Sequence, residues 1–399
     1  IKEEIAKFIE YPFVVLLDRD HNRRDVPLRI LEQVVCIWTL VMKNREPVKA
    51  QEDEWMRYLV LMRNIYKLDK YFGSAALEDG PEVHNEEGST RAHRPENPVP
   101  STASTEEIQL LFLELFSEFV RRHSSVGQWS GSMKVLSILP EIITRVMEMG
   151  ENPGLARNVR VHALRQLQLL LLRINNKDRI ELIMPGVLSC MLRIIQKSDF
   201  KVGHVVFQEV YRVFEIVLTS ACKDNPFKDQ GDHFSLEDLL QLDKNSQKAI
   251  SSPQSLSELE KRIDIAFAAD QYHSLHPLAK MTMVRSAKSI FMTCRLNLKR
   301  VSCTLLEVVM MASFDTSPQS THELRTLANQ SMTEIQKTLG QDFFNDAMFS
   351  FFEDRFSLIS RRLSRIPTLV SEKDKQALFS LLNSYLSVFG EKMRPCLQS

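Results

Sequence analysis

The chain has 399 residues and 44% of them are apolar, which is enough for several hydrophobic cores or for one stacked array. Lysine plus arginine and aspartate plus glutamate both number 51, so the zero net charge indicates neither a nucleic-acid-binding protein nor an acidic carrier, and it favours protein partners. No apolar run approaches the length of about 18–20 residues that a bilayer-spanning helix needs, so we expect no membrane partner.

The amino-terminal region, residues 1–72, has helical periodicity. Asp25-Val26-Pro27-Leu28 is expected to open a strong helix, and a further helix pattern runs from Lys49 to Phe72. Residues 73–105 differ because prolines are mixed with Gly, Ser, Asn and Glu and almost no apolar position recurs. Such a segment cannot bury enough apolar surface to offset the entropy of ordering, so we predict a disordered insertion there.

The central region, residues 106–221, contains the stretch around which the chain is organised, Leu155 to Leu218. Ser104 and Glu107 have the spacing of a capping box, which predicts the start of the helix that leads into this region. The first helix pattern of the organising stretch is apolar on more than one face, so it needs neighbours on both sides, and Leu167 is expected between two layers. The second pattern is expected to begin at Pro185, because proline suits a first helical turn.

The remainder of the chain divides into two parts. Residues 222–257 form a polar surface excursion that contains one short helix pattern, and helical patterns resume in residues 258–399. Gly340 and Gly390 each follow a periodic run, at the position where a helix end favours a left-handed residue.

Helix, short turn, helix is the pattern that these regions repeat, and the few glycines and the lack of alternating β-branched runs favour an all-α class. Asn158-Val159-Arg160 with Ala163-Leu164 has the V-R-x-x-A-L rhythm of the second helix of a HEAT repeat, in which arginine ties adjacent repeats and alanine permits close approach. We therefore predict an α-solenoid of HEAT-like antiparallel helix pairs in residues 1–72, 106–221 and 258–399.

Motifs for catalysis or cofactor binding are not found: the sequence contains no phosphate loop, dinucleotide fingerprint, nucleophile elbow or HExxH pair. Asp270, His273 and His276 have a spacing that could face one metal ion, but a stable site needs further ligands, and a lone pair of histidines in a polar segment is usually structural. We predict no catalytic residues, no cofactor and no metal site.

Six cysteines match neither a zinc pattern nor a small disulfide framework, and we interpret them as reduced core thiols. That interpretation predicts a cytoplasmic protein, with the nucleus as the second expected compartment. The methionines between Met281 and Met311 fit either an adaptable binding surface or the filling of gaps in a core.

Five segments along the chain form a recognisable series. They are Ser137-Ile138-Leu139-Pro140, the leucine-rich helix Ala163 to Leu172, Asp199-Phe200-Lys201-x-Gly203-His204, Phe314-Asp315-x-Ser317-Pro318 and Leu382 to Gly390. Together these segments resemble the amino-terminal part of the TEL-two-interacting protein one family, and they stand in the family's order, although Ser384 replaces an expected glycine.

The resemblance implies a non-enzymatic scaffold subunit of the triple-T cochaperone complex. Members of that family join two other helical-repeat subunits and, with the chaperone machinery, support the maturation and stability of phosphatidylinositol-3-kinase-related kinases, including the target-of-rapamycin kinase. An extended solenoid surface suits that role better than a pocket does.

Two other classes of function stay open. A generic HEAT-repeat adaptor, such as a nuclear-transport or trafficking scaffold, would share the helical periodicity. An enzyme in an all-α fold would need a cluster of buried ionisable residues, which the linear pattern does not reveal.

Phe200, Lys201 and His204 are the candidate partner-binding residues. They combine an aromatic ring, a cation and an imidazole at a corner between helices, where exposed solenoid turns form a continuous edge. The competing interpretation is structural: Phe200 would pack under the turn, and Gly203 would supply a backbone geometry that other residues resist.

Overall fold

The computed structural model describes residues 28–44, 102–122, 133–174, 176–197, 203–224, 253–315, 321–339 and 372–390, and also 352, 353, 355–357 and 359. These residues form twelve helices and contain no strand, which confirms the predicted all-α class and the packing of successive helix pairs. The predicted insertion up to residue 101 and the short helix pattern inside 225–252 lie outside the described residues.

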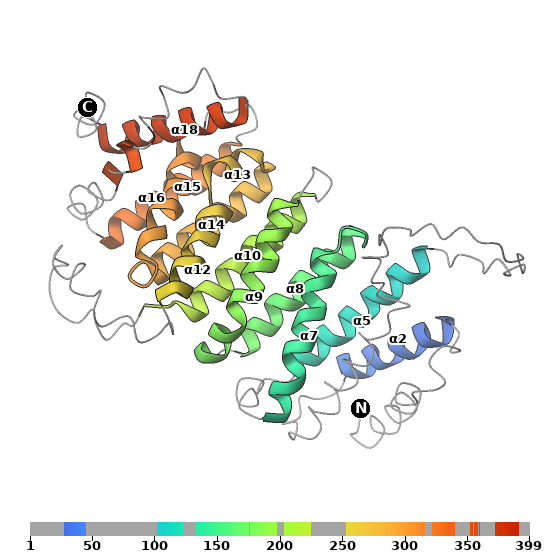
Figure 1. Ribbon diagram of the computed structural model, residues 1–399. Helices are drawn as coiled ribbons and strands as arrows, with labels where there is room; N and C mark the ends of the chain where they lie inside the picture. Colours follow the sequence, from blue (N-terminus) through green and yellow to red (C-terminus); the bar gives the residue numbers. More distant parts are fainter. Residues whose placement is uncertain are drawn as a thin grey trace, which may run out of the picture. The chain divides into compact units, whose positions relative to one another are not determined.

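The chain divides into two compact units, Ile1–Ile174 and Asn175–Ser399. The first unit contains α2 (Leu28–Asn44), α5 (Thr102–Arg122), α7 (Met133–Glu151) and α8 (Arg157–Ile174), of which α2 packs on α5, α5 on α8, and α7 on α8 (Figure 1). The predicted apolar stripe of α5 is buried at Ile108, Phe112, Leu115, Phe116 and Phe119. The helix begins at Thr102, so Ser104 lies within its first turn and is not the N-cap that the capping-box spacing predicted.

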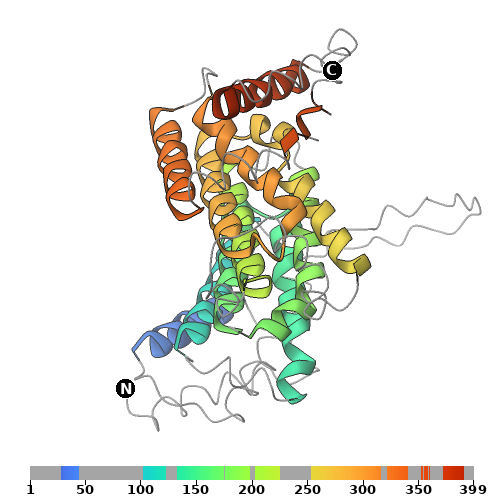
Figure 2. The ribbon, with the colours of Figure 1, turned by 90° about the vertical axis from the view of Figure 1, so that its left-hand side faces the viewer.

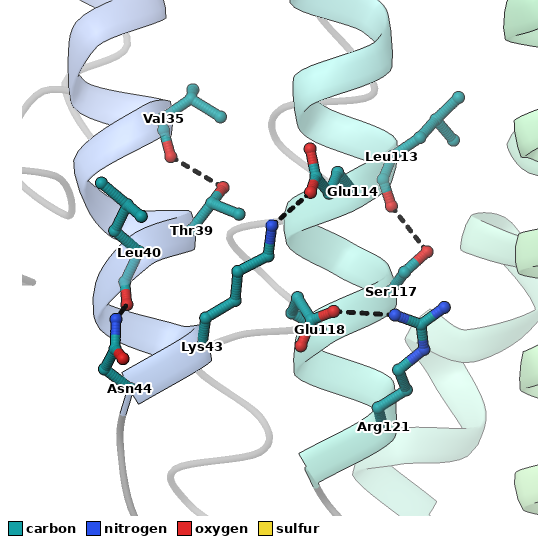
Figure 3. A network of polar contacts seen from close by, with 10 residues as sticks. All are labelled: Val35, Thr39, Leu40, Lys43, Asn44, Leu113, Glu114, Ser117, Glu118 and Arg121. Atoms are coloured by element: carbon teal, nitrogen blue, oxygen red, sulfur yellow. Dashed lines mark hydrogen bonds and ion pairs between the residues drawn. The ribbon is translucent and has the colours of Figure 1, made fainter.

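Figure 3 shows the polar contacts of α2 and α5, one of which joins the two helices. Lys43 at the end of α2 forms an ion pair with Glu114 of α5, and Arg121 pairs with Glu118 one turn away along the same helix. Both pairs are exposed to solvent, where such ion pairs contribute only about 0–1 kcal/mol. The buried apolar side chains therefore stabilise this helix pair, and the charges line its rim.

The turn between α7 and α8 is fixed by the buried Arg160, whose Nε donates to the carbonyl oxygen of Gly150 at 3.0 Å. Burial lowers the pKa of this guanidinium. A Cβ atom on Gly150 would lie 2.9 Å from Cδ2 of Leu164, so any larger residue there would force the Leu164 side chain to shift. Arg160 thus joins the two helices of one pair, and the prediction that it ties adjacent repeats was wrong.

The second unit is a larger stack of helices. The helices α10, α14 and α16 pack in succession, α9 and α15 both contact α12, and the two sets are joined by the contacts of α10 with α9 and of α15 with α14 and α16. Their bounds are α9 (Lys177–Gln196), α10 (His204–Ala221), α12 (Pro253–Ala266), α13 (Ala269–Ser274), α14 (Pro277–Cys294), α15 (Lys299–Ser313), α16 (His322–Leu339) and α18 (Glu372–Phe389).

Helix α9 begins before the predicted start at Pro185, which lies inside it. Asn176 is the N-cap, and its side-chain oxygen accepts from the backbone N–H of Arg179 at 3.2 Å. Ile180 and Met184 are buried ahead of the proline, so the upstream turns have both a cap and a packed face. These two features outweigh the backbone hydrogen bond that the proline cannot donate.

Helix α15 is buried at every residue from Val301 to Ser313. A helix that is enclosed on all sides must be covered by several neighbours, and α12, α14, α16 and α18 all contact it. Gly390 follows α18 with a φ of 54°, which confirms the predicted left-handed helix end, whereas Gly340 lies outside the described residues. None of the described helices has the length and apolar character that a membrane crossing requires.

Candidate functional site

The predicted partner-binding turn is described only at its carboxyl end. Phe200 and Lys201 lie outside the described residues, and Gly203 and His204 lie within them. Gly203 has a φ of 76° and a ψ of 142°, a conformation that favours glycine, so the predicted backbone role of this residue is confirmed. His204 is the first residue of α10, at a half-buried position.

The ring of His204 stacks on the ring of His276, with centroids 4.5 Å apart and planes inclined by 26°. His276 is the N-cap of α14, and its Nδ1 accepts from the backbone N–H of Leu278 at 3.3 Å. A ring nitrogen that accepts carries no proton, so this contact requires the neutral His276 tautomer with its proton on Nε2. Gln208 adds a hydrogen bond from Nε2 to the carbonyl oxygen of Leu278 at 3.1 Å. We call His204, Gln208, His276 and Leu278 the histidine edge.

The histidine edge is positioned by two parallel helices, because α10 and α14 also meet at their carboxyl ends. There the Asp224 carboxylate accepts from the backbone N–H groups of Leu296 at 3.2 Å and Asn297 at 3.1 Å. The Asn297 amide in turn donates to the carbonyl oxygens of Cys222 and Lys223. Because α10 and α14 contact each other at both ends, the two helices hold the histidine edge in place. Leu278 adds an apolar side chain to this edge that is 43% exposed.

The hypothetical metal pair of His273 and His276 does not form. His276 caps α14, whereas the His273 ring packs edge-on against Tyr272 with centroids 5.2 Å apart. Within the described part of the chain, no group of three His, Cys, Asp or Glu side chains could hold a metal ion. The two histidines therefore have separate structural surroundings.

A buried charged cluster lies beside His273 and was missed by the sequence analysis. Asp315 accepts from Nζ of Lys280 at 3.2 Å and from the hydroxyl of Tyr272 at 3.0 Å, and the Lys280 ammonium also lies 4.5 Å from the centre of the Tyr272 ring. Both charged side chains are almost fully buried. One signal was present in the sequence: Lys280 occupies a position in the apolar stripe that continues through Met283, Val284 and Ala287.

The cysteine and methionine predictions concern the core. Cys190, Cys222, Cys294 and Cys303 are buried, as expected for core thiols, whereas Cys36 is only half-buried. Burial raises the pKa of Cys222 to about 12 and that of Cys303 to about 12, which disfavours the reactive thiolate. Met283, Met310 and Met311 are fully buried, so these three methionines fill the core and do not form a binding surface.

His273 should make the stability of the second unit depend on pH. Burial, and then the charge of Lys280, lowers the pKa of His273 below its ordinary value of 6.5. The unfolded chain therefore takes up this proton at a higher pH than the folded chain does, so stability is retained above pH 6.5 and falls as the pH drops through the folded value. Urea unfolding across this range should show a loss that His273→Gln reduces, and identical slopes for the two proteins would contradict the assignment.

A family model described as the TTI1 N-terminal TPR domain matches residues 11–316. This description names the tetratricopeptide type of helix pair, whereas the sequence pattern predicted the HEAT type; both are antiparallel helix pairs that stack into solenoids. No curated protein matches the chain, and no solved structure matches it.

Proposed function

Because the chain belongs to the TTI1 family, we propose that it is a non-enzymatic scaffold subunit of the triple-T cochaperone complex. In this role it binds the two other triple-T subunits and supports the maturation and stability of phosphatidylinositol-3-kinase-related kinases, including the target-of-rapamycin kinase, together with the chaperone machinery. The observation that carries the proposal is the family match across residues 11–316. The expected location is the cytoplasm, with the nucleus as a second compartment.

The packing of α10 against α14 in the second unit supports a role in which side chains at the starts of these two helices bind a partner. Successive pairs place the starts of α10 and α14 side by side, so residues from two repeats contribute to one surface. A partner in contact with that surface would touch rigid helix ends, which lose little conformational freedom on binding.

The histidine edge, together with Phe200 and Lys201, is our proposed partner contact. His204 lies at this edge, and the exposed Leu278 offers an apolar contact beside the two imidazole rings. An aromatic ring and a cation from residues 200 and 201 would add the side-chain types that dominate binding at many protein interfaces.

The proposal is tested by affinity capture of the tagged chain from cell extract, followed by mass spectrometry. We expect recovery of the two other triple-T subunits and of phosphatidylinositol-3-kinase-related kinases. Lys201→Ala combined with His204→Ala should reduce that recovery about tenfold, which is the effect of losing one important contact.

A matched control uses the same two residue types elsewhere. Lys337→Ala combined with His322→Ala changes exposed positions on α16 and should leave recovery unchanged. If both double variants recover the same partners as the unchanged chain, the contact assignment is wrong. If the unchanged chain recovers transport or trafficking cargo and no triple-T subunit, the scaffold proposal itself is wrong.

A further inference from the structure

Helix α18 closes one end of the second unit although it lies beyond residue 316, where the family match ends. Figures 1 and 2 both show α18 lying crosswise over the ends of the helices beneath it, and it packs on α13 and α15. A helix that continued the stack would instead align with its predecessors. The crosswise position indicates a separate mode of attachment.

The attachment centres on Glu307, a buried carboxylate in the middle of α15. Arg355 donates to both of its oxygens, from Nε to Oε1 at 2.8 Å and from Nη2 to Oε2 at 2.9 Å, which is the bidentate geometry that arginine forms with carboxylates. The hydroxyl of Tyr385, in α18, donates to the same Oε1. One acidic side chain of the core therefore binds two donors from the carboxyl-terminal part of the chain.

Aromatic rings extend this attachment. Phe352 lies 5.2 Å from both Tyr385 and Phe389, and Phe356 lies 5.7 Å from Tyr385, measured between ring centres. These ring contacts pack Phe352 and Phe356 against α18 in one aromatic cluster. Burying Glu307 beneath them is costly unless both donors are present, because a buried carboxylate without partners is strongly unfavourable.

We propose that α15 carries a docking slot centred on Glu307, and that α18 with Arg355 closes over α13 and α15 as a strap recognised by this carboxylate. The second folded unit therefore extends past residue 316 to Gly390. The slot has one occupant, the helix α18 of the same chain. This helix presents the phenol of Tyr385 and an aromatic face, and Arg355 from the segment that precedes it supplies the arginine. This proposal is independent of the scaffold function.

The test uses the full chain with a protease recognition sequence inserted after Gly340. After folding and cleavage, the carboxyl-terminal piece should remain bound and should co-elute with the body during size-exclusion chromatography. Glu307→Gln removes the charge while keeping the volume, and it should speed release of the piece by about 10- to 100-fold. Tyr385→Phe removes one donor and keeps the ring, so release should be about tenfold faster.

Glu334→Gln is the matched control because Glu334 also pairs with a basic residue, Lys288, but is 59% exposed. The carboxyl-terminal piece of this variant should be released at the same rate as the piece of the unchanged chain. Immediate release of the unchanged piece would overturn the docking proposal. Release of the Glu307→Gln and Tyr385→Phe pieces at the unchanged rate would overturn the role of Glu307, and the milder Tyr385 variant decides this question even if Glu307→Gln fails to fold.

Discussion

Replacing Leu167 with aspartate should destabilise the first unit by about 3–5 kcal/mol, because it places a charge in an apolar site without a partner. Leu167 is fully buried in α8, which packs against both α5 and α7. The predicted position between layers is therefore confirmed. Urea unfolding followed by circular dichroism should show a large loss of the free energy of unfolding, or the absence of a cooperative first transition.

The same helix provides the control for this experiment. Leu172 is 58% exposed, so Leu172→Asp makes the identical chemical change at the surface and should shift the free energy of unfolding by only about 0.5 kcal/mol. Leu167→Met keeps the volume and should cost less than about 1.5 kcal/mol. Equal unfolding midpoints for Leu167→Asp and Leu172→Asp would show that the packing of α8 has been misassigned.

Asp315→Ala should have a comparable effect on the second unit. It would leave the Lys280 ammonium buried beside Tyr272 without its carboxylate, and removal of one partner from a buried ion pair costs about 3–5 kcal/mol. Chemical denaturation of the variant measures this loss. Replacing both charges, as Lys280→Met with Asp315→Leu, should recover most of the stability because apolar groups of similar volume can replace such a pair.

An exposed ion pair gives the comparison for Asp315. Glu334→Ala removes the partner of Lys288 at the surface and should cost only about 0–1 kcal/mol. A loss for Asp315→Ala as small as that for Glu334→Ala would mean that solvent reaches the Lys280 cluster.

Much of the fold could be predicted because the spacing of apolar residues along the sequence indicates which face of each helix is buried. The run Val206, Val210, Val213, Phe214, Val217 and Leu218 is fully buried in α10, as its spacing predicted. Helix starts were less predictable. Pro185 resembles a first-turn proline, but it lies inside α9. The start of this helix is determined by the cap at Asn176 and by the burial of Ile180, both of which precede the proline.

The candidate site and the charged clusters were harder to foresee because their members are distant in sequence. His204 stacks on His276, and Lys280 pairs with Asp315, only because parallel and antiparallel helices bring those positions together. Periodicity identifies which face of a helix is buried, but it does not give the register of one helix against the next. The bidentate contact of Arg355 with Glu307 depends on that register and has no signature in either local sequence.

Reconstitution from purified components tests the scaffold account most directly. The full chain would be mixed with the two other triple-T subunits, and the assembly would be weighed by native mass spectrometry. We predict one stoichiometric complex that contains all three proteins. Three separate species at concentrations well above those in cells would contradict the proposal that this chain is the scaffold of that complex.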